Sequence, residues 1–154
     1  MISVSEAEKI VLQNAKLLPY EAVSLTEAYG RVLRESIRFD RDQPAFNKST
    51  MDGIAVSVNA VKFGVKKFAV EGVVAAGQKP SKRKKHNGCF RIMTGAVVPS
   101  GCDCVIPVEK VSFQGKQAVI SSDATMVHGC NIRWQGADHK KGTVLFERTV
   151  PISI

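Results

Sequence analysis

The chain reads DQPAFNKSTMDGIAV from Asp42 to Val56, a stretch that combines a polar loop, an acid and an apolar strand. Pro44 opens the loop, and Asp52 and Gly53 stand directly before the apolar run. A carboxylate at such a junction can face a cleft, while a glycine lets a ligand approach the backbone closely. The same pattern also fits a turn aspartate that hydrogen-bonds its own backbone. The residues alone leave both interpretations open.

Short apolar runs separated by turn signals continue from this stretch to about residue 120. The clearest hairpin signal is Gln114-Gly115, which stands between two such runs. This spacing is typical of an all-β sandwich or small barrel, so we expect a mainly β protein with a few helices (α+β). The expected strands are Ile54–Val58, Phe68–Val74, Phe90–Met93, Cys104–Pro107, Val111–Phe113 and Ala118–Ile120.

The N-terminal region carries a helix signal instead. Ser3 followed by Glu6 matches a capping box, and apolar residues then recur at helical spacing up to Leu18. We therefore expect an amphipathic helix that needs a partner surface. Beyond it we expect a strand at 21–25, a helical turn at 26–29 closed by Gly30, and a strand at 32–37.

The 154 residues carry a formal net charge of +8 at pH 7, and many of the cations gather in the loop from Lys79 to Lys85. Such a field attracts anions, although a solvated loop that aids solubility has the same composition. No aromatics are interleaved with the basic run, so we expect no nucleic-acid partner. Because these cations repel one another and the loop holds no acid, we expect it to be mobile.

The four cysteines and three histidines do not form metal-ligand patterns. There is no C-x-x-C pair, and four cysteines are too few for a disulfide framework at this length, so we expect them to be buried as small apolar residues. The histidines have no ligand spacing and are expected at the surface. The N-terminus lacks a secretory signal and the apolar runs are short, which predicts a cytoplasmic protein without a membrane partner.

Two later stretches add polar groups at similar junctions. From Arg91 the chain reads RIMTGAVVPSGCD, where Thr94 and Gly95 follow an apolar run. A hydroxyl and free backbone N–H groups in this setting can bind an oxyanion, but a plain turn fits equally well. From Asn131 it reads NIRWQGAD, and its last residue is Asp138. Lysines follow Asp138 closely, a pattern that an ordinary solvated surface acid also shows.

These three stretches, in this order, resemble the signatures of the molybdopterin molybdenumtransferases, the family of MoeA and the gephyrin E-domain. The likeness runs from about Val4 to Val150, with Ile54 in place of a usual aromatic. Enzymes of this family insert molybdate into adenylylated molybdopterin. The resemblance implies catalytic roles for Asp52, Thr94 and Asp138, cofactor binding by Ser49, Gly53, Gly95 and Glu109, and Mg²⁺ binding by Asp52 and Asp138.

The resemblance also implies an organisation and partners. A β-rich lobe at 41–138 is expected as an insertion into a small split domain made of 1–40 and 139–154. The expected partners are adenylylated molybdopterin, molybdate and a second copy in a homodimer of the full-length parent. Because the family's α/β domain follows this region, we expect the chain alone to be inactive. The alternative is a non-catalytic dimerisation or interaction module.

Overall fold

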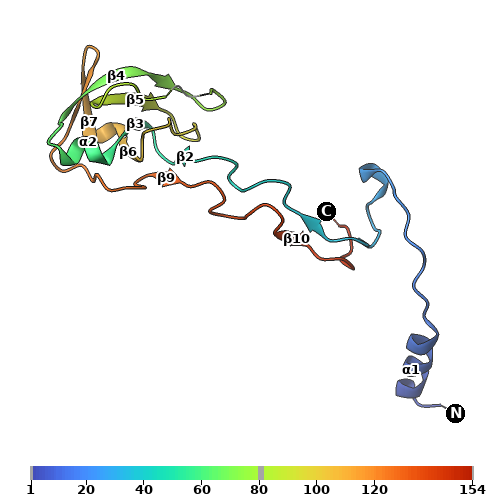
Figure 1. Cartoon of the computed structure of the whole chain (residues 1–154). Coiled ribbons are helices and arrows are strands. Elements are labelled where there is room, and N and C mark those ends of the chain that lie inside the picture. The colour runs from blue at the N-terminus through green and yellow to red at the C-terminus, as the bar shows by residue number, and fades with distance from the viewer. Residues whose placement is uncertain (1, 80–81, 154) are drawn as a thin grey trace. The chain divides into compact units, whose positions relative to one another are not determined.

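The computed structural model describes residues 2–79 and 82–153, and it is mainly β with two α-helices (Figure 1). This confirms the expected fold class. By their contacts, residues 38–144 form one compact unit, which we call the β lobe. The segments up to residue 37 and from 145 onward form another, the terminal unit. We describe each by itself, and the domain boundaries expected from the sequence stay predictions.

Helix α1 (Val4–Asn14) begins the terminal unit with the expected capping box. Ser3 Oγ accepts a hydrogen bond from the Glu6 backbone N–H at 3.3 Å, and Glu6 Oε2 accepts one from the Ser3 N–H at 2.8 Å. The helix ends at Asn14, short of the expected Leu18, and Ala15 already has extended backbone with φ −67° and ψ 124°. None of its residues is buried.

The strand expected at 21–25 is wrong, because those residues have no strand pairing and the helical turn begins already at η1 (Leu25–Glu27). The strand expected at 32–37 is reduced to an isolated bridge from Val32 to Pro151 and to β1 (Ile37–Arg38). Strand β1 pairs with β10 (Val144–Phe146). An apolar run becomes a strand only where a neighbour accepts its backbone hydrogen bonds.

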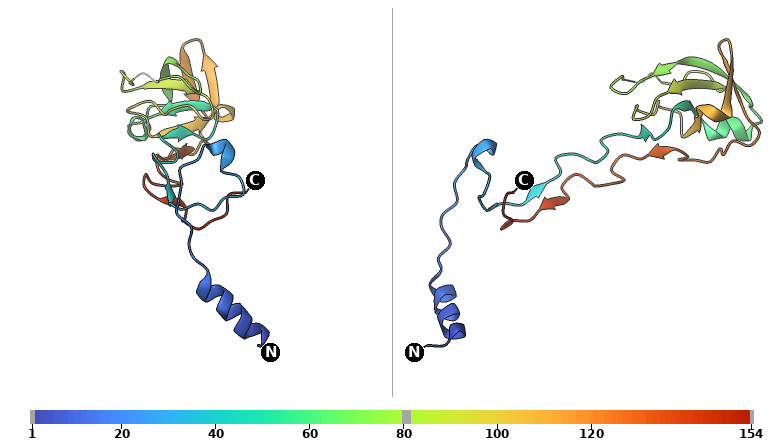
Figure 2. Two further views of the ribbon diagram at one scale, coloured as in Figure 1. Left: turned by 90° about the vertical axis from the view of Figure 1, so that its right-hand side faces the viewer. Right: turned by 180° about the vertical axis from the view of Figure 1, so that it is seen from behind.

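A curled six-stranded sheet forms the β lobe, in the order β6-β3-β5-β4-β8-β7 (Figures 1 and 2). Strands β4 and β5 are parallel, and the other neighbours are antiparallel. Each of the six runs expected as strands overlaps one observed strand, and the hairpin at Gln114-Gly115 is confirmed. The strands are β3 (Gly53–Val56), β4 (Lys67–Val74), β5 (Gly88–Ile92), β6 (Cys104–Pro107), β7 (Val111–Gln114) and β8 (Gln117–Ile120).

Both faces of this sheet carry a core. Ile54 and Val56 belong to one buried cluster, and Ala55, which lies between them in β3, belongs to the other. This alternation is what a strand covered on both faces produces. Ile54 is fully buried, so the residue that replaces the family's aromatic fills the core.

The sequence did not predict helix α2 (Val58–Lys62), which follows β3. Its five residues are too few to show a helical period, and its buried residues, Val58 and Ala60, alternate as they would in a strand. Asp103 Oδ1 accepts a hydrogen bond from the Val58 N–H at 2.7 Å. Asp103 therefore stabilises the first turn of α2 by accepting one of its free backbone N–H groups.

Two short strands join the first and third sequence stretches. Strand β2 (Lys48–Ser49) pairs antiparallel with β9 (Ile132–Arg133), with Ser49 opposite Ile132. The Thr50 N–H also donates a hydrogen bond to the Asn131 carbonyl oxygen at 3.0 Å. The residues just before Asp52 are thus tied to the segment that leads to Asp138.

Candidate functional site

Asp52 and Thr94 lie together although 42 positions separate them in sequence. Asp52 precedes β3 and Thr94 follows β5, and these antiparallel strands place Gly53 opposite Ile92. Asp52 Oδ1 accepts two hydrogen bonds from Thr94, from its backbone N–H at 2.7 Å and from its hydroxyl at 2.6 Å. Both residues are exposed, so the pair faces solvent at the ends of two inner strands of the sheet.

Thr94 also sets the charge of this pair. Its hydroxyl and then its backbone N–H stabilise the Asp52 carboxylate, and they lower the pKa of Asp52 below the ordinary value of 3.8. Asp52 is therefore ionised at neutral pH. Since the Thr94 hydroxyl donates its proton to Asp52, its oxygen lone pairs are the part of Thr94 that can accept a further hydrogen bond.

The two glycines of the expected site differ in their surroundings. Gly53 is buried between β5 and β6, and a Cβ built there would collide with the Ile106 carbonyl oxygen. Gly95 has φ +80°, a left-handed conformation that favours glycine, and its N–H donates to the Ser49 carbonyl at 2.8 Å. Both glycines shape the backbone beside the Asp52 and Thr94 pair, and their cofactor-binding roles stay predictions.

Ser49 and Glu109 occupy opposite environments. Ser49 is 1% exposed, and its hydroxyl donates to the Met51 carbonyl at 2.6 Å, which fixes the turn that leads to Asp52. Glu109 is exposed in η2 (Val108–Lys110). The residue before it, Val108, donates its N–H to the Asp52 carbonyl at 2.9 Å. The backbone thus holds Glu109 near Asp52 and leaves its side chain exposed. The Ser49 side chain, in contrast, is used in a hydrogen bond that stabilises the turn.

Asp138 is engaged by another residue of its own stretch. Its Oδ1 accepts hydrogen bonds from the Arg133 guanidinium, with Nε at 2.8 Å and a second, shorter contact from Nη2. Its backbone N–H donates to the Gln43 carbonyl at 2.9 Å. Within residues 2–79 and 82–153, no hydrogen bond joins Asp138 to Asp52 or Thr94. That these residues share one face of the lobe stays a prediction.

Asp52 has the right chemistry for one ligand of a magnesium ion. Only its Oδ1 is used by Thr94, so Oδ2 is left as a hard oxygen donor among the described residues. No group of three or more His, Cys, Asp or Glu side chains that could hold a metal occurs in that part of the chain. The residues fit a Mg²⁺ ion that takes most of its ligands from phosphate oxygens and water, as Mg²⁺ commonly does.

Most of the expected positions are confirmed, with the histidines at the surface and the cysteines in the core. The three histidines are exposed, and Cys89 and Cys104 are buried, while Cys102 and Cys130 are half-buried. Burial raises the pKa of the Cys89, Cys102 and Cys104 thiols to about 12. These three thiols are therefore unreactive at neutral pH, in agreement with a structural role.

The hydrogen bonds that hold the basic loop have no signal in the sequence. In the described part of the loop, Glu71 of β4 accepts hydrogen bonds from the Lys84 and Lys85 N–H groups at 2.8 and 2.7 Å. No sequence signal pairs Glu71 with this loop, because the parallel register of β4 and β5 brings it there. The expected mobility also covers Pro80 and Ser81, which lie outside the described residues. The mobility of the loop therefore stays a prediction.

In the described part of the chain, no helix combines the length and the apolar character that crossing a membrane requires.

Comparisons with known proteins agree with these features. Residues 2–154 match the family described as the MoeA N-terminal region (domain I and II). A molybdopterin molybdenumtransferase of Synechocystis is 35% identical over 96% of this chain and 38% of its own length. Gephyrin of Dictyostelium discoideum is 30% identical over 96% of this chain and 22% of its own length.

Solved structures show the same relationship. The molybdopterin biosynthesis MoeA protein from Pyrococcus horikoshii superposes with a TM-score of 0.81 at 28% identity, over 96% of this chain and 38% of that one. A second structure of a MoeA protein from this organism gives a TM-score of 0.79 at 30% identity, over 94% of this chain and 39% of that one. The chain thus spans about two fifths of the length of these bacterial and archaeal relatives. It belongs to the family of the MoeA N-terminal region, which comprises domains I and II.

Proposed function

We propose that this chain supplies the acid-and-hydroxyl wall of the active site of a molybdopterin molybdenumtransferase, which inserts molybdate into adenylylated molybdopterin. The observation that carries the proposal is the double hydrogen bond from Thr94 to Asp52 Oδ1. It joins two residues from separate motifs of the resemblance, at the exposed ends of β3 and β5. An aspartate that only stabilised its own turn would hydrogen-bond the backbone of that turn and would not need Thr94.

The roles follow from the chemistry of the pair. Asp52 is a carboxylate at neutral pH, because Thr94 lowers its pKa. It can therefore hold a cation as a hard oxygen ligand. Thr94 fixes the direction of this carboxylate and offers its oxygen as an acceptor. The turn at Gly95, with φ +80°, brings the backbone near the same place.

We propose that further residues join this pair in the site. Asp138 contributes a second carboxylate, whose charge Arg133 balances. Glu109 contributes a third acid beside the Asp52 backbone, while Ser49 and Gly53 keep the turn and the strand in place. Asp52 and Asp138 would hold Mg²⁺ together with phosphate oxygens and water. Such an ion would neutralise phosphate charge in this site.

The rest of the site lies outside this chain in our proposal. Because the chain spans about two fifths of its bacterial relatives, we propose that it is inactive alone and acts within a longer, homodimeric enzyme. One observation favours the alternative of a dimerisation module: α1 exposes Val4 by 87% and Val11 by 68%, so its apolar side chains have no cover. A cytoplasmic location and the lack of a nucleic-acid partner stay predictions.

The test is Asp52→Asn in a full-length molybdenumtransferase that carries this region. Asparagine keeps the size and hydrogen bonding of the side chain but removes its charge, so we expect single-turnover molybdate insertion and AMP release to slow by about 100-fold or more. The stability should change little, since Asp52 is exposed at the surface.

Glu147→Gln is the matched control. Glu147 is also exposed, and its hydrogen-bond partner is the Ser36 hydroxyl, outside the proposed site. Both variants lose one negative charge, so a general electrostatic effect would slow them equally. An Asp52→Asn enzyme that inserts molybdate at the wild-type rate would contradict the catalytic assignment and favour the interaction module.

A further inference from the structure

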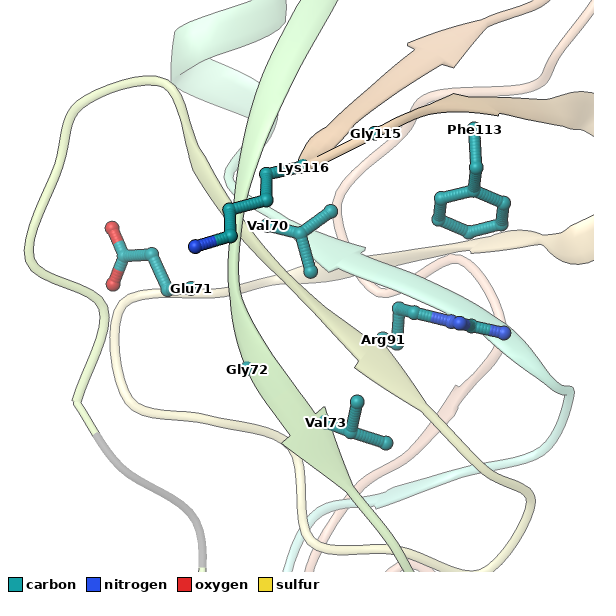
Figure 3. Close-up of a pocket in the computed structure, with 8 residues that line it drawn as sticks. All are labelled: Val70, Glu71, Gly72, Val73, Arg91, Phe113, Gly115 and Lys116. Carbon is teal, nitrogen blue, oxygen red and sulfur yellow. The ribbon is translucent and has the colours of Figure 1, made fainter.

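A hollow of about 390 Å³ lies between β4, β5 and the β7–β8 hairpin (Figure 3). Strand β4 lines it with a bulge, where the register shifts between Val70 and Gly72. Figure 3 shows the Lys116 ammonium pointing toward Glu71 and the Arg91 guanidinium pointing the opposite way. The two cations therefore do not converge on one ligand, and none of the four cysteines lines this hollow.

Two of those cysteines lie side by side elsewhere in the β lobe. Cys104 is the first residue of β6, and Cys130 lies in the turn before β9. The Gly129 N–H donates a hydrogen bond to the Asp103 carbonyl oxygen at 2.7 Å, and the Val105 N–H donates one to the Cys130 carbonyl oxygen at 2.9 Å. These two bonds join the residues on either side of Cys104 to Cys130 and the residue before it. They hold the two segments next to each other.

The spacing of these segments suits a disulfide. Neighbouring hydrogen-bonded strands lie about 4.8 Å apart, and the two Cα atoms of a disulfide lie about 4.4–6.8 Å apart. The Cys130 thiol is also close enough to the Cys104 thiol to form a hydrogen bond with it. Cys130 packs against the core cluster to which Cys104 belongs. The two sulfur atoms can therefore bond without a large movement of the backbone.

The two thiols differ in their access to solvent. Cys104 is fully buried, whereas Cys130 is half-buried. Burial, and next the neighbouring Cys130, raises the pKa of the Cys104 thiol to about 12. A reagent in solution therefore meets Cys130 first, and Cys104 can react only with what Cys130 has become.

We propose that Cys104 and Cys130 form a disulfide when the protein meets hydrogen peroxide. The Cys130 thiolate attacks one peroxide oxygen, so that an S–O bond forms, the O–O bond breaks, and the leaving hydroxide takes up a proton as water. The Cys104 sulfur then attacks the Cys130 sulfur. An S–S bond forms, the S–O bond breaks, and the second hydroxide leaves as water with the Cys104 proton. Two thiols are oxidised by two electrons, and the peroxide is reduced to two molecules of water.

Contact between the two sulfurs makes the second step possible despite the high pKa of Cys104. With this pKa, about one Cys104 side chain in 10⁵ is a thiolate at neutral pH. A reacting group held in contact acts at an effective molarity of about 10⁵ M or more. The contact therefore offsets the small thiolate fraction. A thiolate of high pKa is also the stronger nucleophile.

The test treats the folded 154-residue chain with hydrogen peroxide, blocks the remaining thiols with iodoacetamide and maps tryptic peptides by mass spectrometry. We expect two of the four thiols to be lost and to return with dithiothreitol. The linked peptides should be 92–110, which contains Cys104, and 117–133, which contains Cys130. The oxidised chain should also unfold at a higher urea concentration than the reduced chain, because the bond restricts the unfolded state.

Cys130→Ala should abolish the link. The matched control is Cys102→Ala, because Cys102 is also half-buried. Cys102 shares a tryptic peptide with Cys104, so a link that persists in Cys102→Ala must be made by Cys104. Circular dichroism verifies that both variants are folded.

The proposal is overturned if no link forms in the folded wild-type chain, if the link joins other cysteines, or if Cys130 is oxidised to an acid that Cys104 does not attack. It is also overturned if Cys102→Ala loses the link and Cys130→Ala keeps it. This test needs no molybdate insertion, so its outcome is independent of the proposed function.

Discussion

The β lobe and the terminal unit differ in where their apolar residues lie. In the described part of the chain, Ala28 is the one buried apolar residue of the terminal unit, whereas the lobe has two buried clusters. In the terminal unit, Leu17 is 86% exposed and Leu25 is 90% exposed. The lobe can therefore be stabilised by its own residues, while the terminal unit requires a surface from elsewhere to bury its apolar side chains.

The largest effect should come from two phenylalanines of the lobe with opposite exposure. Phe68 in β4 is fully buried, and Phe63 at the end of α2 is 79% exposed. Phe68→Ala should lower the free energy of unfolding by about 3–5 kcal/mol, because it leaves a cavity in the core. Phe63→Ala should lower it by about 0.5 kcal/mol or less. Urea unfolding followed by fluorescence or circular dichroism measures both, and equal losses would break the claim of a packed lobe core.

A smaller loss should follow at Gly53, where the backbones of β3 and β6 approach closely. The added methyl group of Gly53→Ala would meet the Ile106 carbonyl oxygen, so β6 must shift. We expect a loss of about 3 kcal/mol, at the upper end of ordinary overpacking. The control, Gly115→Ala, meets nothing within 4 Å and carries only the strain of φ +59°, about 1 kcal/mol. A Gly53→Ala variant as stable as Gly115→Ala in the same urea assay would contradict this close approach.

The same contrast explains how much of the fold could be predicted from sequence. Strands such as β6 and the β7–β8 hairpin were found because each apolar run ends at a turn signal and has a neighbour in the lobe. The strand expected at 21–25 failed because the run has no such neighbour among the described residues. The parallel pairing of β4 with β5 and the bulge after Val70 depend on contacts between distant residues, which local patterns do not contain.

The candidate site also depends on contacts between distant residues that local sequence patterns do not contain. The residue types of Asp52 and Thr94 indicated an acid and an oxyanion-binding hydroxyl, but only the register of β3 against β5 brings them together. The partner of Asp138 was in the same stretch, since Arg133 stands five positions before it. Arg133 could thus have been assigned from the sequence by its spacing, whereas the contact of Glu71 with the basic loop could not.

The smallest effect concerns the charge of the Asp52 and Thr94 pair. Thr94→Val keeps the shape of the side chain but removes the hydroxyl, so the pKa of Asp52 should rise toward 3.8. Because the pKa is lowered in the folded protein, its stabilising contribution is present above pH 3.8 and is lost as the pH falls through the lower, folded value. Carboxyl carbon NMR across this range measures the shift. An Asp52 pKa that is the same in both proteins would contradict the hydrogen bond.

Hydrogen exchange of the 154-residue chain measures the contrast between the lobe and the terminal unit most directly. Strand β3 lies between β5 and β6, so the amides of Ile54 and Ala55 should exchange only when the lobe unfolds. The amides of α1, which has no buried residue, should exchange close to the rates of an unfolded chain. This result is predicted for a lobe with its own core beside a terminal unit that lacks one, and equally strong protection of α1 and β3 would contradict it.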